Sequence, residues 1–435
     1  MIRLSLALLF SCAFLAATEA PPTYNKDIAP IFQRNCQACH RPGEAAPMSL
    51  LTYKEVRPYV AAIKEAVSLH KMPPWYADPH FGKFSNDRAL SQQDIDTVVA
   101  WTKAGAPEGD PKDLPAPAKF VDGWNIGNPD LVLEMPMAFN VPATGTVEYQ
   151  YILVPGKFTE DMWVQKVEVR PGNRAVMHHV IAFVRPPGSK WLSGIQPGVP
   201  YVPPKKDSQN TDDGQFLVGY APGMPPDTFP DGRAKVIKAG SDIIFQMHYT
   251  PNGKATTDIT KIGLVTAKAP VKERVVTLAA MTRDFVIPPG DANHQVESEF
   301  EFGHDARIVT LMPHMHLRGK DFEFKAIYPT GETQTLLSVP HYSFSWQLVY
   351  YPASDIVMPK GTKLHCTAHY DNSANNRFNP DPTKEVRYGD QSWEEMMFGF
   401  FDVAIDKDMD VGKLFPEKKK EAAESKRAPA SSSIQ

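Results

Sequence analysis

The stretch SDIIFQMHYT, residues 241–250, carries the pattern that decides the fold of most of this chain. Ile243, Phe245 and Met247 occupy one set of alternate positions, and the intervening set is Asp242, Ile244, Gln246 and His248. A period of two is typical of a β-strand that buries one face. The same alternation appears at Val147, Tyr149 and Tyr151.

Similar runs extend from about residue 120 to residue 405 and are separated by turns rich in proline and glycine. These turns include RPPG (185–188), APGMPP (221–226), IPPG (287–290) and MPKG (358–361). Proline is excluded from helix interiors and from central strands, so such segments mark strand ends. The region is too long for one comfortable sandwich. We therefore expect two β-sandwich, jelly-roll-like lobes, over residues 123–283 and 284–410.

The residues before this region follow a different period. Apolar side chains recur at helical spacing between Thr52 and His70, and a second run begins at Ser91 and stops at Gly105. Ser91 with Asp94 is a capping signal. The predicted fold class is therefore multidomain: a small all-α domain over residues 21–110, a linker over 111–122, and the two all-β lobes. The polar tail over 411–435 is predicted to be disordered.

Residues 1–20 have the features of a secretory signal peptide. Arg3 precedes an apolar run, and small residues follow near Ala20. A retained anchor and a lipoprotein site at Cys12 are the alternatives. The run is short for a membrane span, and no second apolar segment follows, so we expect an exported protein, periplasmic or extracellular, that is not an integral membrane protein after signal removal.

The net charge argues against a nucleic-acid partner, and the cysteine content argues against disulfide bonds. The formal net charge is −4, and no long basic stretch precedes the last twenty-five residues, which argues against a nucleic-acid partner. After signal removal the cysteines are Cys36, Cys39 and Cys366. The first two belong to one motif, so no disulfide is expected in the β region.

The sequence Cys36-Gln37-Ala38-Cys39-His40 is a CxxCH motif. It predicts one haem c, bound covalently through Cys36 and Cys39, with His40 as an iron ligand. A chance match and a zinc half-site are the alternatives, and no second cysteine pair exists to complete a zinc site. The loop after the first helix offers Met72 as the sixth ligand, in competition with Met48, His70 and His80. Together with its flanking helices, the motif resembles a class I-like cytochrome c.

Two groups of histidines in the β region have the residue types of metal ligands. His178 and His179 open an apolar strand, and His248 lies on an alternating strand. Adjacent strand residues diverge, so the first pair can reach one ion only if the strand end is irregular or if different ring nitrogens are used. Hydrogen-bonding roles are the alternative for all three.

The second group combines imidazoles with a thioether. His314 and His316 are two residues apart and share one face of a strand. Met396 or Met397, in WEEMM, would add sulfur, and two imidazoles with a thioether suit Cu(I), the oxidation state that binds dioxygen. We therefore predict a copper ion at this second group.

Four other residues near these motifs could contribute to a site. His365 and His369 share a strand face and could support the ligands or contact substrate. Arg174 and Arg318 could hold an anionic group of a substrate. Structural hydrogen bonding and surface charge are the alternative roles.

The order HH, QMHYT, HMH and EEM resembles that of the ascorbate-dependent type II copper monooxygenases, which include the peptidylglycine α-hydroxylating and dopamine β-monooxygenases. The resemblance covers roughly residues 125–405. It implies two sandwich lobes with one copper each: an electron-storing site at His178, His179 and His248, and an oxygen-binding, catalytic site at His314, His316 and Met396. Met396 is assigned because it follows Glu-Glu as the family pattern does.

Two features set this chain apart from the animal members of that family, which are rich in disulfides and take electrons from ascorbate. This chain lacks the cysteines and carries a haem motif. The expected activity is hydroxylation of a C–H bond of a small organic or peptide substrate with O2, with electrons from an external donor passing through the haem. The alternative is a non-enzymatic electron-transfer or copper-binding protein.

Overall fold

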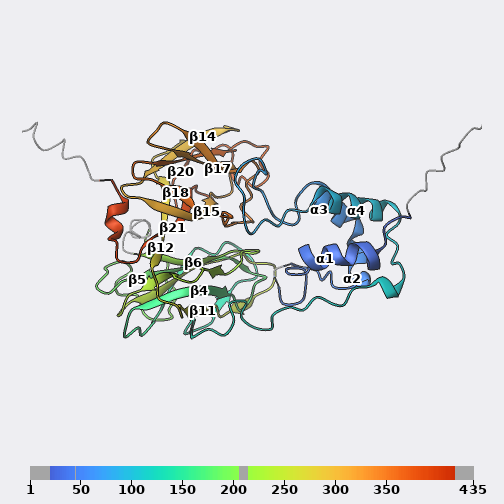
Figure 1. Cartoon of the computed structure of the whole chain (residues 1–435), viewed down its shortest axis with the longest axis horizontal. Coiled ribbons are helices and arrows are strands. Elements are labelled where there is room, and N and C mark those ends of the chain that lie inside the picture. The colour runs from blue at the N-terminus through green and yellow to red at the C-terminus, as the bar shows by residue number, and fades with distance from the viewer. Residues whose placement is uncertain (1–19, 45, 205–213, 417–435) are drawn as a thin grey trace, which may run out of the picture. The chain divides into compact units, whose positions relative to one another are not determined.

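The computed structural model describes residues 20–44, 46–204 and 214–416 of the chain (Figure 1). The predicted signal peptide, apart from its last residue, and most of the predicted disordered tail lie outside these ranges. The chain forms two compact units. The helical unit comprises Met1–Ala38, Met48–Pro73 and Leu90–Ala118, and the β unit comprises Cys39–Pro47, Pro74–Ala89 and Lys119–Gln435.

The helical unit packs short helices around a small aromatic core. Thr52 and Glu55 form a reciprocal capping box, and the Ser91 hydroxyl accepts the Asp94 N–H. Tyr24 and Trp101 are buried together, with ring centroids 6.3 Å apart. The α-helices are α1 (Ala29–Asn35), α2 (Tyr53–Val56), α3 (Val60–Ser68) and α4 (Gln92–Lys103). Shorter turns of helix cover Tyr24–Ile28, Arg57–Tyr59 and Pro111–Asp113.

The expected fold class, with a small all-α cytochrome c-like domain over residues 21–110, is wrong. The chain is mostly β, and its longest α-helix in the described ranges has 12 residues. Segments 39–47 and 74–89 also belong to the β unit. Trp75 packs on Tyr350 with ring centroids 4.9 Å apart, and Phe84 forms a β-bridge with Pro352. These aromatic side chains bury their area in the β unit, so residues 21–110 are not one helical domain.

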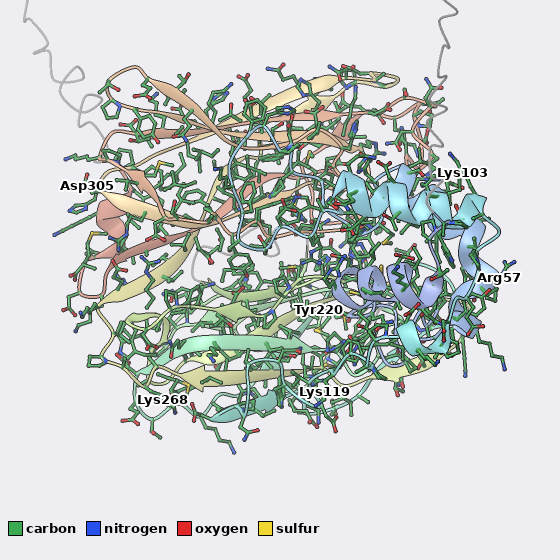
Figure 2. All side chains as sticks on the ribbon, turned by 45° about the vertical axis from the view of Figure 1, so that its right-hand side comes forward. Arg57, Lys103, Lys119, Tyr220, Lys268 and Asp305 are labelled. Carbon is green, nitrogen blue, oxygen red and sulfur yellow. The ribbon has the colours of Figure 1, made fainter. Side chains whose placement is uncertain are left out.

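The first sandwich pairs a four-stranded sheet, in the order β3-β9-β5-β6, with the strands β1, β11, β4 and β8. Its core joins both layers, for example Ile152, Val180 and Phe245 with Val167 and Leu264. Its strands are β1 (Leu131–Glu134), β2 (Phe139–Val141), β3 (Gln150–Val154), β4 (Met162–Arg170), β5 (Met177–Arg185), β6 (Gln215–Tyr220), β7 (Asp227–Thr228), β8 (Arg233–Ile237), β9 (Asp242–Tyr249), β10 (Thr256–Asp258) and β11 (Lys261–Thr266). Tyr220 at the end of β6 and the exposed Lys268 after β11 are labelled in Figure 2.

The second sandwich pairs the sheet β14-β19-β16-β17 with the strands β12, β21, β15 and β18. Its core includes Phe324 and Leu364 from one layer and Phe401 and Val403 from the other. Its strands are β12 (Glu273–Thr282), β13 (Val286–Ile287), β14 (His294–Glu301), β15 (Ala306–His314), β16 (Gly319–Ile327), β17 (Thr333–Val339), β18 (Ile356–Met358), β19 (Lys363–Tyr370), β20 (Val386–Arg387) and β21 (Met397–Asp406). A final turn of helix spans Val411–Leu414.

The two sandwiches share one sheet. β8 and β12 pair in parallel, which joins the inner strands into a nine-stranded sheet in the order β1-β11-β4-β8-β12-β21-β15-β18, with β7 on β4. β12 pairs along its whole length with β21, so it belongs to the second sandwich although it precedes residue 283. Across the described ranges, no helix is both long enough and apolar enough to cross a bilayer.

Candidate metal centre

Three histidines of the first sandwich converge at one end of its four-stranded sheet. His178 and His179 lie at the start of β5, and His248 lies near the end of the neighbouring strand β9, opposite His179. The register between these strands shifts between Met177 and His179. That irregularity removes the strict alternation that would separate His178 from His179. One nitrogen from each of the three rings lies within 4.8 Å of the others.

The ring nitrogens of this cluster are buried and neutral, as the ligands of a metal ion would be. His178 Nε2 and His248 Nδ1 are buried and have no hydrogen-bond partner in the part of the chain that the structure describes, and His178 Nδ1 lies 3.1 Å from His179 Nδ1. A buried polar atom without a partner is costly unless something else satisfies it. Burial lowers the pKa of His178 to about 4 and lowers the pKa values of His179 and His248 well below 6.5. The three imidazoles are therefore neutral at pH 7, the form that binds metals.

His314 and His316 form a second pair at the end of β15, with ring centroids 5.2 Å apart. His314 Nδ1 lies 2.9 Å from Gln347 Oε1, and His316 Nδ1 lies 3.2 Å from the Glu394 carbonyl oxygen. Both partners are acceptors, so each Nδ1 carries the hydrogen and each Nε2 keeps its lone pair. His316 Nε2 is buried, and no described residue forms a hydrogen bond with it. This is the arrangement of metal-binding histidines, whose second nitrogen is fixed by an outer acceptor.

The structure distinguishes between the two methionines. Met397, at the start of β21, is fully buried in the core of the second sandwich, and its sulfur accepts a hydrogen bond from Ser298 Oγ at 3.0 Å. The next residue, Phe398, lies opposite His314 in the register, with ring centroids 6.4 Å apart. Met396 immediately precedes β21, and the alternation of strand residues, if it extends back by one residue, would place Met396 on the face of Phe398 and His314. The burial of Met397 in the core leaves Met396 as the predicted sulfur ligand.

The two histidine groups meet at Phe344. The Phe344 ring stacks on His178 with centroids 4.5 Å apart and lies 6.1 Å from the ring of His316. The separation of His178 from His316 therefore cannot exceed the sum of these two distances. The groups are close enough that His314 contributes to lowering the pKa of His178, after burial. The sequence predicted two sites in two lobes, whereas the structure brings five imidazoles together where the lobes meet.

Phe344 belongs to a loop that also supports the second pair. The Tyr342 hydroxyl donates to the Met315 carbonyl at 2.7 Å and accepts the Met315 N–H at 3.0 Å. Gln347 holds His314 and donates to the Phe344 carbonyl at 3.0 Å. Sequence reasoning missed this loop. Its only signal was the aromatic run HYSFSW at residues 341–346, which lacks a strand period.

The haem motif follows directly on α1. The Cys36 N–H donates to the Phe32 carbonyl at 2.9 Å, so helical hydrogen bonding continues to the first cysteine. Cys39 and His40 begin a loop, Cys39–Pro47, that belongs to the β unit. In that loop Glu44 forms ion pairs with Arg41 and with Arg174. Arg174 lies four residues before His178, so the second half of the motif is held beside the strand that carries the first cluster.

The candidate sixth ligands of the haem are placed as follows. Met72 follows α3, and its N–H donates to the Ala66 carbonyl at 3.3 Å. Met48 packs against the core of the helical unit. His70 is exposed, and the side chain of His80 is 82% exposed and lies 2.6 Å from Asp78 Oδ1. Met72 remains the predicted sixth ligand of the haem iron.

The remaining sequence candidates have structural partners. Arg174 is paired with Glu44, and Arg318 is only 2% exposed, so neither is the surface charge that was the alternative. His369 lies 2.6 Å from Asp321 Oδ1 and 3.3 Å from Gln295 Oε1. His365 lies 3.7 Å from Glu297 Oε1. Both histidines stand on β19 in hydrogen-bonding or ionic contacts of the ordinary structural kind.

A separate hollow of about 790 Å³ lies at the edge of the first sandwich. It is lined by residues of β1, by residues 154–163, which connect the end of β3 to the start of β4, and by Thr266 and Ala267. It includes none of the five clustered histidines. We therefore do not assign the redox chemistry to this hollow.

The depressed pKa values give a pH prediction for the metal-free protein. The histidines titrate near 6.5 in the unfolded chain but at about 4 in folded His178 and His314. The unfolded chain therefore binds protons first, and the free energy of unfolding falls as pH drops from about 6.5 to about 4. Protonation of each of these two residues should lower the free energy of unfolding by about 2 kcal/mol at pH 5. Thermal unfolding at pH 7 and pH 5 measures this.

The control for this prediction is a His178→Gln/His314→Gln variant, whose melting temperature should depend less on pH. Copper added in excess should also restore the stability of the unmodified protein at pH 5, because a ligand that binds only the native state stabilises it. An equal pH dependence in variant and unmodified protein would contradict the assignment of these two groups.

No protein-family model and no curated protein matches this chain. Among solved structures, the one described as "Structure of PNGF-II in C2 space group" is 10% identical over 63% of this chain and 65% of that chain, with a TM-score of 0.27. The STIV MCP is 10% identical over 63% of this chain and 96% of that chain, with a TM-score of 0.25. The chain thus spans less than two thirds of the first structure. Likenesses this weak carry no argument about fold or function.

Proposed function

We propose that this chain is an exported, periplasmic or extracellular, haem- and copper-dependent monooxygenase that hydroxylates a C–H bond of a small organic or peptide substrate with O2. His178, His179 and His248 would hold one copper ion, and His314, His316 and Met396 would hold the other. The proposal agrees in motif order with the type II copper monooxygenases that the sequence resembles.

One observation carries the proposal: three buried and two half-buried histidines from two sandwiches lie together, and Phe344 contacts His178 of one group and His316 of the other. Three of their ring nitrogens have no hydrogen-bond partner among the described residues. A purely structural histidine cluster would satisfy those nitrogens with hydrogen bonds. Neutral imidazoles with an added thioether are the donor set that copper prefers. Copper bound there would supply one-electron transfer and the activation of dioxygen.

The chain's own residues provide orientation and exclusion of water. Gln347 and the Glu394 carbonyl fix the rings of His314 and His316 with Nε2 presented. Phe344 lies between the two groups and covers His178 with an apolar face. A buried, apolar surround strengthens electrostatic interactions and excludes the water that would cause side reactions.

The CxxCH motif is proposed to bind one haem covalently, as a one-electron carrier between an external donor and the first copper site. The support is local: Cys36 continues the last turn of α1, and the loop after Cys39 is tied to Arg174 near His178. Where His40 and Met72 bind the iron, the thioether would raise the reduction potential.

Covalent attachment gives a direct prediction. The purified exported protein should keep its haem after extraction with acidified organic solvent, because thioether bonds survive that treatment. A Cys36→Ala/Cys39→Ala variant should lose covalent haem completely while retaining the copper sites. Haem-stained gel electrophoresis and mass spectrometry measure the attachment, and a variant that kept covalent haem would rule out these two cysteines.

Oxygen uptake separates the enzyme from the alternative of an electron-transfer or copper-binding protein. An oxygen electrode with reduced protein and a library of small organic and peptide substrates should show consumption that requires copper and matches product formation. Oxygen-independent electron exchange, with no product from any substrate, would favour the carrier.

A further inference from the structure

A buried carboxylate joins the two segments that carry His316 and Met396. Glu395 is 0% exposed and immediately precedes Met396. Its Oε2 accepts the backbone N–H of His316 at 2.9 Å, and its Oε1 accepts the backbone N–H of Arg318 at 2.7 Å. The Glu395 side chain therefore binds the backbone of His316, one proposed ligand, and the next residue in the chain is Met396, another proposed ligand.

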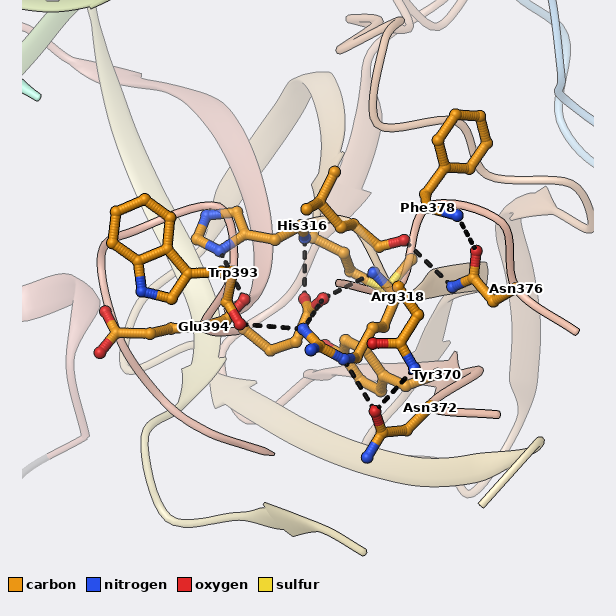
Figure 3. A network of polar contacts seen from close by, with 12 residues as sticks. His316, Arg318, Tyr370, Asn372, Asn376, Phe378, Trp393 and Glu394 are labelled. Atoms are coloured by element: carbon orange, nitrogen blue, oxygen red, sulfur yellow. Dashed lines mark hydrogen bonds and ion pairs between the residues drawn. The ribbon is translucent and has the colours of Figure 1, made fainter. Parts of the chain in front are cut away.

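Burial raises the pKa of Glu395 to about 8, and the backbone N–H groups and the Arg318 guanidinium act in the opposite direction by favouring the carboxylate. Arg318 connects this carboxyl group to the surrounding loops (Figure 3). Its Nη1 lies 3.9 Å from Glu395 Oε1 and donates to the Trp393 carbonyl at 2.9 Å, while its Nε donates to Asn372 Oδ1 at 2.9 Å. Asn372 is itself fully buried and donates to the carbonyls of Pro288 and Lys384. The pair is thus bound on several sides by fixed backbone.

The contacts run in both directions between the two segments. Glu395 binds the His316 N–H, Arg318 binds the Trp393 carbonyl, and the Glu394 carbonyl fixes the ring of His316. A displacement of residues 393–395, the segment that leads into Met396, away from His316 and Arg318 would break all three. Buried ion pairs add little to stability compared with apolar side chains, but they can fix one specific arrangement.

We propose that the Arg318–Glu395 pair is a positioning device that sets the place of the Met396 thioether relative to His314 and His316. Neither residue contacts substrate in this role, and both act through the three ligands. The inference rests on the proposed function, because it takes those three residues to bind copper.

The test is Glu395→Gln in the full-length protein. An amide offers one acceptor oxygen where the two backbone N–H groups need two, and its NH2 group would face the second N–H donor. With Cu(I) bound under anaerobic conditions, copper-edge X-ray absorption should show the sulfur shell in the unmodified protein and its loss in the variant. Copper affinity at this site should fall by on the order of 10- to 100-fold.

A matched control separates positioning from general stability. Glu168 in the first sandwich is also buried and also accepts two backbone N–H groups, from Asn125 and Ile126. Glu168→Gln should keep the sulfur shell and the copper affinity, even where its melting temperature falls. If Glu395→Gln does not fold, Arg318→Lys, which keeps the charge but not the forked geometry, carries the test with the same expected loss.

The outcomes distinguish this inference from the proposed function. A sulfur shell and copper affinity that stay unchanged in Glu395→Gln, or that fall equally in Glu168→Gln, would overturn the positioning role alone. An unmodified protein that binds two coppers without any sulfur shell would overturn both the positioning role and Met396 as a ligand. An unmodified protein that binds no copper would overturn the proposed function and this inference with it.

Discussion

Replacing His314 and His316 together by alanine is expected to reduce bound copper from two ions per chain to one and to reduce O2-dependent substrate oxidation to background. The two rings are the imidazoles of the second site, and their Nε2 atoms are presented by the acceptors on Nδ1. A methionine alone does not hold copper, so the whole site is lost. The first cluster has its own three histidines and should keep its ion.

Copper is counted by elemental analysis after removal of loosely bound metal. His365→Ala/His369→Ala is the matched control, because it removes two histidines from another strand of the same sandwich. It should retain both ions. Loss of both coppers from the His314→Ala/His316→Ala variant would mean that the two groups bind as one unit, and loss of neither would contradict the second site.

Copper removal is expected to have the second large effect, on reoxidation of the haem. When the chemically reduced protein is mixed with oxygen, the haem absorbance should return to the oxidised form quickly with both copper sites filled and slowly without copper. The loop after Cys39 belongs to the same unit as the proposed copper ligands, and covalent connection gives a high effective concentration of one redox partner near the other.

Met396→Ala should slow this step by on the order of 10- to 100-fold, because it changes the copper at which oxygen reacts. It should leave the haem spectrum unchanged. Met397→Leu is the control, because Met397 lies in the core and the exchange conserves volume. Stopped-flow spectroscopy at the haem band decides the point. Equal rates in copper-free and copper-loaded protein would show that haem and copper are not coupled.

The alternation of apolar residues was sufficient to predict the β region, because burial of one face leaves a period of two in the sequence. It also identified the histidines by their strand positions. His314 is the last residue of β15, and the ring of His316 lies 5.2 Å from its ring although His316 is outside the strand. The register shift between Met177 and His179 is the irregular strand end that the first cluster needed.

The features that could not be predicted from the sequence are those that depend on contacts between distant segments. Trp75 and Phe84 follow a helical stretch, yet their apolar partners lie in the second sandwich, so the predicted helical domain was wrong. Phe344 and Gln347 reach the histidines from a loop without a period. The backbone N–H of Arg318 is bound by Glu395, which is 77 residues away in the chain. None of these pairings has a local signal.

Metal analysis of the full-length protein, expressed with ample copper and exported, tests the central claim most directly. The measurement is the number of copper, zinc and iron atoms per chain after gel filtration. The account predicts two copper atoms and one iron atom, with negligible zinc. Protein without copper, or with zinc in its place despite ample copper, would contradict the assignment of the five histidines and Met396 to a two-copper centre.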